Sequence, residues 1–427
     1  MALHFTRAEF VERQRKTRAE MTRQGLDGLL IFRQESMYWL TGYDTEGFVL
    51  FQGMYLSADG RIALCTRSAD DLQSRMTSTL EDIRIWRDVE GANPSIDLRN
   101  MVQDLGGRGK KIGVEYHAYG LTGQRAKLVD AAFDGFAELS DASDLVRLQR
   151  LVKSPAELAY VRRAGELADD ALAVANRMCV PGEHVGAIYG EMINVIMRGD
   201  GDPSAMRWPM GGGQEAMLVR YHTGHGKVGA QDQVMFEFAS AYRHYHTALM
   251  NVVLTGKPDP RHLDMFKAAR DALDACWEVV RPGNTVGEIF DTHARALSKA
   301  GYDGCYLNAC GYTLGVTYPP NWMDWPMCWH GNPQVLEPGM VFFLHMILLD
   351  GRTGLSMSLG ETSIVTRGAA DLVNHAPREP VLSGSASARK IAKPAVKKAA
   401  KPVHKAAAKR KPAVKRTARP KAKARRR

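Results

Sequence analysis

The second half of the chain repeats one pattern of helix, turn, helix and strands. A helix-like stretch ends in a Pro-Gly turn at residues 180–182, and a second ends in a similar turn at residues 280–283. A new helix start follows each turn. Strand-like runs then follow, at 233–239 and 244–254 in the first copy and at 340–349 and 361–366 in the second. The repeat predicts one domain with an internal pseudo-two-fold duplication and a site between its halves.

The region before residue 146 alternates strand-like and helix-like segments. Residues 5–23 predict a helix that Gly25 ends, and the apolar run after it predicts a strand. Further strand-like runs, RIALCT, IRIW and KIGVE, alternate with helix-like runs. This alternation is typical of an α/β domain with a mixed sheet, which we place at residues 1–146.

A strong helix start opens the second domain. Ser154 supplies a capping side chain, Pro155 suits the first helical position, and Glu157 completes a capping box. Apolar residues then recur at helical spacing up to the first Pro-Gly turn. We therefore place the duplicated domain of helices and strands at residues 147–370.

Positive charge is concentrated near the C-terminus. The formal net charge is +10, from 57 Lys and Arg against 47 Asp and Glu. Residues 389–427 hold 18 of these Lys and Arg and no acidic residue, so 39 basic residues stand against 47 acidic ones elsewhere. We expect residues 384–427 to form a disordered tail, because like charges repel and little apolar surface can be buried. Such a tail could contact nucleic acid without sequence preference.

Three features favour the cytoplasm. The sequence has no run of ~18 apolar residues, the length that a membrane span needs, so we expect no membrane contact. The N-terminal stretch lacks the apolar core and cleavage site of a signal peptide. The six cysteines form no CxxC pair, which suits reduced and mostly buried thiols.

Several segments together carry a resemblance to a known family. They are GLDGLLIFRQESMYWLTGYD, VKSPAELAYVRRAGELAD, DQVMFEFASAYRHYHTALMNVVLTG, VRPGNTV, CGYTLGVTYPPNW, LEPGMVFFLHM and GETSIVT. They resemble the pita-bread (M24-type) family, which includes creatinase, aminopeptidase P, prolidase and ectoine hydrolase. The resemblance implies a creatinase-type α/β N-terminal domain, an α+β pita-bread catalytic domain and a homodimer.

The same resemblance implies five positions at which metal-binding members carry two Asp, one His and two Glu. These positions fall on Glu237, Ala248, Tyr312, His345 and Glu361. Alanine has no donor atom, a neutral tyrosine is a poor ligand, and a dinuclear site needs about five ligands with bridging carboxylates. We therefore expect no metal cofactor, with a divalent metal as the runner-up.

Two family members are most similar to the chain. Ectoine hydrolase is similar in the segments 237–246 and 311–322, and creatinase, which also lacks the metals, shares the Tyr-x-Thr-Ala-Leu stretch at 245–249. The chain departs from both at His345 and from creatinase at Met250, where creatinase has a glutamate. The resemblance implies a small zwitterionic or nitrogen-rich substrate and leaves its identity open.

Metal-free hydrolysis of a C–N bond needs a base or nucleophile, a donor for the developing charge and an acid for the leaving nitrogen. Glu237 lies in the apolar run VMFEF, where desolvation disfavours its charge, so it suits a nucleophile or general base; a structural pairing with Arg243 or a nearby histidine is the alternative. His222 corresponds to the acid–base histidine of creatinase. The catalytic candidates are Glu237, His222, Tyr312, Glu361 and His345.

Five further residues are candidates for substrate binding. His244 and His246 are two apart on a predicted strand, so they are expected to share one face. Tyr43 lies on a turn of the first domain that in dimeric relatives reaches a partner's pocket. The five candidates are Tyr242, His244, His246, Tyr43 and Trp322.

Three functions remain open at this point. The first is a metal-independent hydrolase of a small molecule, similar to ectoine hydrolase or creatinase. The second is a metallohydrolase directed at Xaa-Pro peptides, with a rewired site that uses Glu237, His345 and Glu361. The third is a non-catalytic binding protein whose basic tail contacts nucleic acid.

Overall fold

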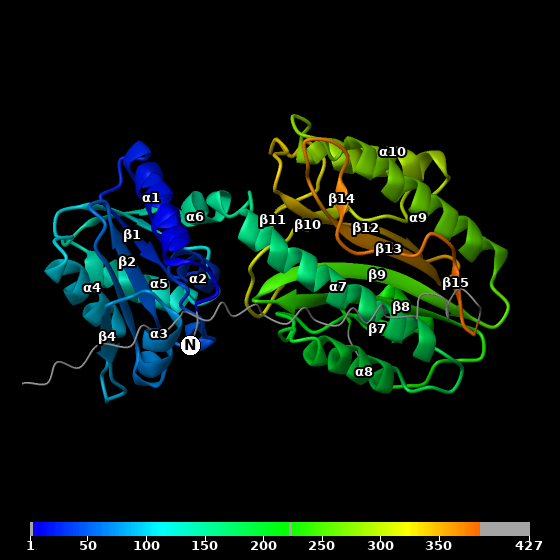
Figure 1. The fold of residues 1–427 in the computed structure, drawn as a ribbon, viewed down its shortest axis with the longest axis horizontal. Coiled ribbons are helices and arrows are strands. Elements are labelled where there is room, and N and C mark those ends of the chain that lie inside the picture. The colour runs from blue at the N-terminus through cyan, green and yellow to red at the C-terminus, as the bar shows by residue number, and fades with distance from the viewer. Residues whose placement is uncertain (1–2, 222–223, 385–427) are drawn as a thin grey trace, which may run out of the picture. The chain divides into compact units, whose positions relative to one another are not determined.

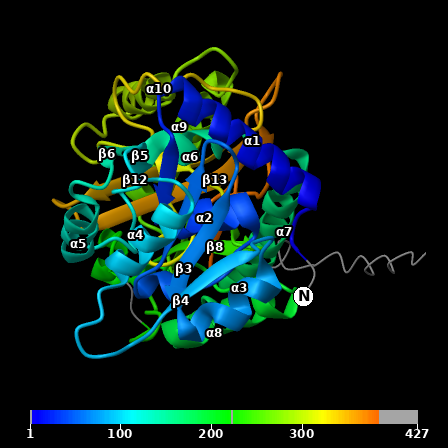
Figure 2. The ribbon, with the colours of Figure 1, turned by 90° about the vertical axis from the view of Figure 1, so that its left-hand side faces the viewer.

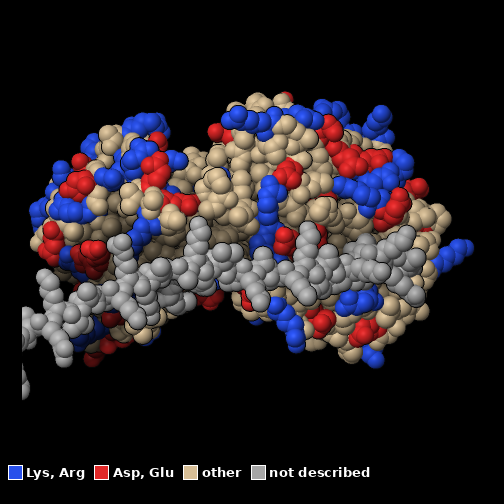
Figure 3. Space-filling view, in the orientation of Figure 1, with Lys and Arg blue, Asp and Glu red and all other residues tan. Residues whose placement is uncertain are grey.

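The computed structural model describes residues 3–221 and 224–384. The predicted disordered tail, residues 384–427, lies outside these residues except for its first position. None of the helices among the described residues combines the length and the hydropathy that a membrane span requires. On the face of these residues that Figure 3 shows, Lys and Arg side chains are interspersed with Asp and Glu.

The N-terminal region folds around a six-stranded mixed sheet, as the α/β alternation predicts. Its strand order is β4-β3-β2-β1-β5-β6. The pairs β1–β2 and β2–β3 are antiparallel, and the other pairs are parallel. The strands are β1 (Gly28–Ile31), β2 (Gly53–Ser57), β3 (Ile62–Arg67), β4 (Asp82–Trp86), β5 (Lys111–Val114) and β6 (Glu138–Asp141).

Helices cover both faces of this sheet. Leu30 belongs to one apolar cluster, whereas Leu29 and Ile31 belong to another, because successive residues of a strand point to opposite faces. Figure 2 shows α3 and α4 beside β3 and β4, which they contact. The helices are α1 (Arg7–Arg23), α2 (Gln34–Thr41), α3 (Asp71–Thr77), α4 (Pro94–Asp104), α5 (Gly123–Phe133) and α6 (Ser143–Gln149).

The C-terminal region is built on a larger sheet with the strand order β11-β10-β12-β13-β9-β8-β7. Its strands are β7 (Met210–Gly212), β8 (Asp232–Tyr242), β9 (Tyr245–Thr255), β10 (Gly311–Thr313), β11 (Asp324–Met327), β12 (Val341–Asp350) and β13 (Leu355–Ile364). Two short strands, β14 (Asp371–Leu372) and β15 (Val381–Leu382), pair with β13 and β9. The central hairpins β8–β9 and β12–β13 therefore lie side by side (Figure 1).

A pair of helices precedes each central hairpin, so the predicted duplication is present. The pairs are α7 (Pro155–Met178) with α8 (Val185–Arg198), and α9 (Pro260–Val279) with α10 (Val286–Lys299). Helix α7 packs on β8 and β9, and α9 packs on β12 and β13 (Figure 1). The turns within the helix pairs contain Gly182 and Gly283 at φ values of 91° and 92°, a conformation that glycine adopts without strain.

Two expected boundaries differ from the structure. Residue 146, the expected end of the first domain, falls inside α6, which closes that domain by packing against α1. The expected end of the second domain at residue 370 is too early, because β14 and β15 continue its sheet. Two-residue strands of this kind have no periodicity that a sequence pattern could reveal.

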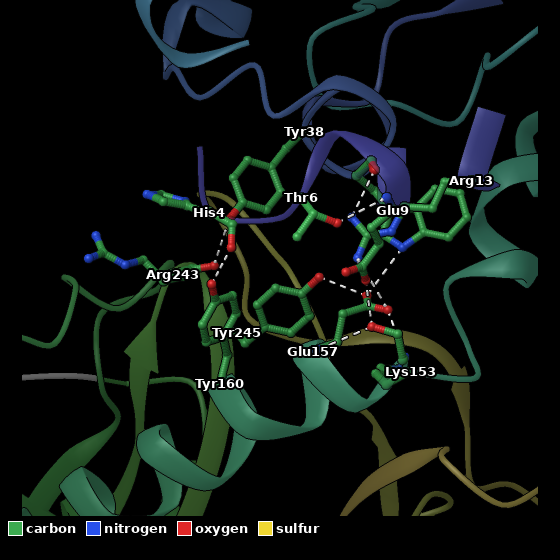
Figure 4. A network of polar contacts seen from close by, with 12 residues as sticks. His4, Thr6, Glu9, Arg13, Tyr38, Lys153, Glu157, Tyr160, Arg243 and Tyr245 are labelled. Atoms are coloured by element: carbon green, nitrogen blue, oxygen red, sulfur yellow. Dashed lines mark hydrogen bonds and ion pairs between the residues drawn. The ribbon is translucent and has the colours of Figure 1, made fainter. Parts of the chain in front are cut away.

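The buried carboxylate of Glu157 connects the two domains. The predicted capping box is present: the Ser154 hydroxyl accepts from the Glu157 backbone N–H, and the Glu157 carboxylate accepts from the Ser154 N–H at 2.8 Å. The same carboxylate accepts from Trp39 Nε1 at 3.2 Å. It also accepts from the Tyr245 hydroxyl at 2.7 Å (Figure 4). One capping residue therefore joins α2, α7 and β9.

Arg13 of α1 supplies the positive charge beside this carboxylate. Its side chain is only 4% exposed, and its Nη2 lies 2.7 Å from Glu9 Oε1 and 3.5 Å from Glu157 Oε2. Its guanidinium also lies over the ring of Phe5 at 4.1 Å and donates to the Trp39 carbonyl. Buried charges that are paired in this way stabilise a fold only while both partners are present.

We predict that Arg13→Leu lowers the free energy of unfolding by about 3 kcal/mol, because it leaves the Glu157 and Glu9 carboxylates without their buried partner. Arg15→Leu on the same helix is the matched control. Arg15 is 59% exposed and pairs with Glu12 in solvent, so its loss should cost less than about 1 kcal/mol. Urea unfolding of both variants measures the difference, and equal losses would contradict the role given to Arg13.

Candidate functional site

A cavity of about 140 Å³ opens beside the central strands of the large sheet. Strands β8, β10 and β12 and the loops before β8 and before and after β10 form its walls. Four predicted site residues line it: Glu237, Tyr312, Trp322 and His345. The other lining residues are Met206, Val219, Arg220, Leu307, Ala309, Met323, Met327 and Ile347.

The strand register sets which side chains face this cavity. Glu237 pairs with Met250, Met250 with Gly360, and Gly360 with His345, so these four positions form one row across β8, β9, β13 and β12. The Ser240 hydroxyl donates to the Ala164 carbonyl of α7, so even-numbered residues of β8 face the helices. Glu237 and its row therefore face away from α7 and α9.

Glu237 is a buried carboxyl group with its pKa near neutrality. Burial raises the pKa to about 7, and the positive charge of Arg220 opposes this rise. A carboxyl group at that pKa is partly protonated at neutral pH and can both take up and return a proton.

Tyr312 presents its phenol to the same cavity. Its oxygen accepts a hydrogen bond from Trp322 Nε1 at 2.8 Å, which leaves the phenol proton free to donate elsewhere. Burial, together with the nearby charge of Glu237, holds the pKa of the phenol well above its ordinary value. Tyr312 therefore remains a neutral donor at physiological pH.

His345 lies beside Tyr312, with 5.7 Å between the ring centroids. Burial lowers the pKa of its imidazole to about 3, and the charges of His293 on α10 and of Arg220 act in the same direction. The ring is therefore neutral at physiological pH. Its Nδ1 is buried and has no hydrogen-bond partner among the residues described.

Glu361 is not part of this cavity, contrary to the sequence-based assignment. It pairs with Leu344, the neighbour of His345, so it points to the helix-covered face of the sheet. There its carboxylate accepts from Trp277 Nε1 at 2.8 Å, from the Ala376 N–H at 2.9 Å and from Arg378 Nη2 at 2.6 Å. The register instead places Gly360 opposite His345.

His244 and His246 do not share a strand face, also contrary to expectation. His244 lies with Arg243 in the two-residue turn between β8 and β9, both with positive φ values of 63° and 53°. Its Nε2 lies 2.9 Å from Asp44 Oδ1, and its ring stacks on Tyr318. It therefore contacts the N-terminal domain rather than the cavity.

The buried ring of His246 is held by protein groups. Its Nε2 accepts from the Ala205 N–H at 3.0 Å, and its Nδ1 lies 2.9 Å from the Thr317 hydroxyl. Burial lowers the pKa of this imidazole to about 3. His246 therefore links β9 to the loops that contain Ala205 and Thr317, and it does not line the cavity.

Tyr43 and Tyr242 are also placed elsewhere. Tyr43 is buried in the core of the N-terminal domain, where its hydroxyl donates to Gln52 Oε1 at 3.2 Å, and burial raises its pKa. The ring of Tyr242, at the end of β8, packs on Tyr160 at 5.6 Å. The sequence alone does not show whether a tyrosine at such a position packs in the core or contacts a substrate.

One predicted residue is not described by the structure, and one cavity residue was missed by the sequence analysis. His222 lies outside the described residues. Arg220, two positions before it, lines the cavity and was not predicted. The segment LVRYHTGHG is the only signal for it, and an arginine in a polar loop is more often solvated.

Comparison with known proteins places these features in a family. The model of the metallopeptidase family M24 matches residues 159–367, and the model of the creatinase/prolidase N-terminal domain matches residues 13–152. The two matches cover both domains in the order that the structure shows. The chain belongs to the M24 family of hydrolases.

Two M24 relatives and one solved structure match this chain over nearly their whole length. Ectoine hydrolase of Halomonas elongata is 26% identical over 398 residues, which cover 89% of this chain and 98% of the relative. An Xaa-Pro dipeptidase of Pyrococcus horikoshii is 19% identical, covering 86% of this chain and 98% of that enzyme. The solved structure of dipeptidase PepE from Mycobacterium ulcerans superposes with a TM-score of 0.78 at 21% identity, covering 89% and 99%.

The donor set at the M24 metal positions does not fit a dinuclear centre. Ala248 offers no donor, Tyr312 is a neutral phenol whose oxygen already accepts from Trp322, and Gly360 stands opposite His345 where Glu361 was expected. Within residues 3–221 and 224–384, no group of three or more His, Cys, Asp and Glu side chains is placed to hold a metal ion. Of the five positions, this leaves the Glu237 carboxyl group and the His345 imidazole as donors at the cavity, fewer than a dinuclear centre needs.

We predict that Glu361→Gln lowers stability without removing turnover. The change leaves Arg378 with only the exposed Asp274, 3.6 Å away, as a charge partner, so the free energy of unfolding should fall by about 1–3 kcal/mol. Activity per folded molecule should stay close to that of the parent chain. A fully folded Glu361→Gln protein without activity would show that Glu361 takes part in the chemistry.

Proposed function

We propose that this M24 hydrolase cleaves a C–N bond of a small zwitterionic or nitrogen-rich molecule without a metal ion, with Glu237 as the base. The supporting observation is that one small cavity combines Glu237, whose pKa is about 7, with the neutral donors Tyr312 and His345. This set supplies a proton acceptor and hydrogen-bond donors on buried side chains around one cavity.

The proposed reaction adds water to the carbon of an amide, amidine or guanidine group. The Glu237 carboxylate takes one proton from the water while the oxygen of the water bonds to that carbon. The phenol of Tyr312 donates a hydrogen bond to the heteroatom on which negative charge develops. The C–N bond then breaks, and the proton held by Glu237 passes to the leaving nitrogen.

The size of the cavity and the relatives support a small substrate. A volume of about 140 Å³ is well below the ~300–1,000 Å³ of pockets that enclose drug-sized ligands. Ectoine, the substrate named for the Halomonas elongata relative, is a cyclic amidine that carries a carboxylate. It is therefore the first compound to test, followed by creatine and related cyclic amidines.

A metal-dependent Xaa-Pro dipeptidase is the second candidate. It is favoured by the Xaa-Pro dipeptidase relative and by the similarity in fold to solved dipeptidases. The donor set described above argues against it, because peptide cleavage in this manner would rely on a metal-activated water.

A substrate screen separates the two candidates. Ectoine, creatine, related cyclic amidines and Xaa-Pro dipeptides are each incubated with a chelator and with added divalent metal, while elemental analysis records the metal content. We expect hydrolysis of a small amidine or guanidine compound that the chelator does not change. Cleavage of Xaa-Pro dipeptides that a chelator removes and a divalent metal restores would establish the second candidate instead.

The pKa of Glu237 predicts the pH dependence of the reaction. Because the carboxylate form is the base, kcat/KM should fall about tenfold per pH unit below about pH 7 and level off above it. Glu237→Gln should lower kcat/KM by at least about 100-fold. Initial rates between pH 5 and 9 measure both effects, and Glu278→Gln on the surface is the matched control, since Glu278 is 77% exposed.

The same variant tests the buried carboxyl group without any substrate. A raised pKa means that the stability present below the unfolded pKa of 4.5 is lost as pH rises through about 7. Glu237→Gln removes this loss, so it should become more stable relative to the parent chain by up to about 3 kcal/mol between pH 5 and pH 8. A pH-independent difference in urea unfolding would contradict the assigned pKa.

A further inference from the structure

A second cavity adjoins the one that holds Glu237. Its volume is about 240 Å³, and residues of both domains line it. Met323 and Met327 line both cavities, so their side chains form part of the partition between them. The charged and titratable residues of the second cavity are Arg33, Glu35, Tyr116, His117, Tyr119, Arg147 and Asp324.

Arg147 of α6 enters this cavity from the N-terminal domain. Its side chain is 9% exposed, and its guanidinium lies 5.4 Å from the ring centre of Trp325. Its Nη2 donates to Asp144, whose own side chain is 57% exposed. Its Nε is buried without a hydrogen-bond partner among the described residues. Arg147 therefore has unused capacity to donate.

Arg33 and His117 form the adjacent wall. Arg33 Nη2 donates to the His117 carbonyl and lies 3.3 Å from His117 Nδ1, while Arg33 Nε has no partner among the residues described. If Nδ1 accepts this hydrogen bond, the ring proton is on Nε2, which can donate. Burial and the charges of Arg33 and Arg147 lower the pKa of His117, so its ring is neutral.

The acidic residues of the cavity already have partners in the protein. Asp324 lies 3.2 Å from Nη1 of the buried Arg150 and accepts from the Trp325 N–H at 2.9 Å. Glu35 accepts from the Tyr318 N–H at 3.3 Å. Asp324 therefore has a cationic partner and Glu35 accepts one backbone hydrogen bond, whereas the Nε atoms of Arg33 and Arg147 have no hydrogen-bond partner among the described residues. This asymmetry favours a ligand that brings a negative charge.

We propose that the cavity lined by Arg33 and Arg147 binds the carboxylate group of a small molecule. Two guanidinium groups present planar pairs of N–H donors that match the two oxygens of a carboxylate. Partial burial strengthens such contacts by excluding water. The source of the carboxylate is either the substrate, an assignment that rests on the proposed function, or a second small acid that binds beside the substrate.

The test compares matched ligands with and without the negative charge. Acetate and acetamide are titrated into the full chain by ligand-observed NMR, and ectoine and the same ring without its carboxylate are titrated by calorimetry. We expect the charged member of at least the acetate pair to bind about tenfold more tightly, and Arg147→Gln to remove the preference. Arg33→Gln should weaken it, and Arg67→Gln, which alters an ion pair elsewhere in the N-terminal domain, should leave it unchanged.

Competition distinguishes the two sources. If the substrate carboxylate occupies the cavity, acetate competes with ectoine; if a second acid occupies it, acetate and ectoine bind together. Glu237→Gln is included because it should lose turnover and keep the preference for carboxylates, so failure of the proposed chemistry leaves this result intact. Equal binding of acetate and acetamide to the parent chain, or an unchanged preference in a folded Arg147→Gln protein, overturns the proposal.

Discussion

Desolvation on the central sheet sets the protonation states of the ionisable groups buried there. The strands β8, β9, β12 and β13 are buried along almost their whole length, and this burial raises the pKa of both carboxyl groups, Glu237 and Glu361. Glu361 has Arg378 and two further donors. Glu237 has only the distant charge of Arg220, and its pKa rises to about 7. The two buried carboxyl groups therefore differ in their partners: Glu361 accepts three hydrogen bonds, whereas the rise in the pKa of Glu237 is opposed by the charge of Arg220.

The same constraint explains why the neighbouring side chains are neutral donors. His345 has its pKa lowered by burial, and Tyr312 has its pKa raised, so both are uncharged over the physiological range. A neutral imidazole and a neutral phenol can donate or accept hydrogen bonds without the cost of burying a charge. Tyr312 and His345 stand at two of the positions that the resemblance aligns with metal ligands, so both of these positions carry uncharged side chains.

Periodicity and capping signals predicted the fold well because they act locally. The alternation of strands and helices, the capping box at Ser154 and Glu157, and the duplicated Pro-Gly turns each follow from a few adjacent residues, and the structure contains all of them. The site was predicted only in part, because a one-residue shift in strand register moves a side chain to the other face. That shift separates Glu361 from His345, and a hairpin turn removes His244 from the strand of His246. Burial of Tyr43 depends on contacts distant in sequence, which no motif reports.

Two methionine side chains, Met323 and Met327, form a flexible wall that the two cavities share. Met323 and Met327 have unbranched side chains with three rotatable bonds, so they can adopt several shapes at little cost in packing energy. Trp322, the donor that orients the Tyr312 phenol, directly precedes Met323 in the chain. Because these thioethers can move at little cost, a ligand in one cavity would change the shape of a wall that the other cavity shares, one residue away from the indole that donates to the Tyr312 phenol.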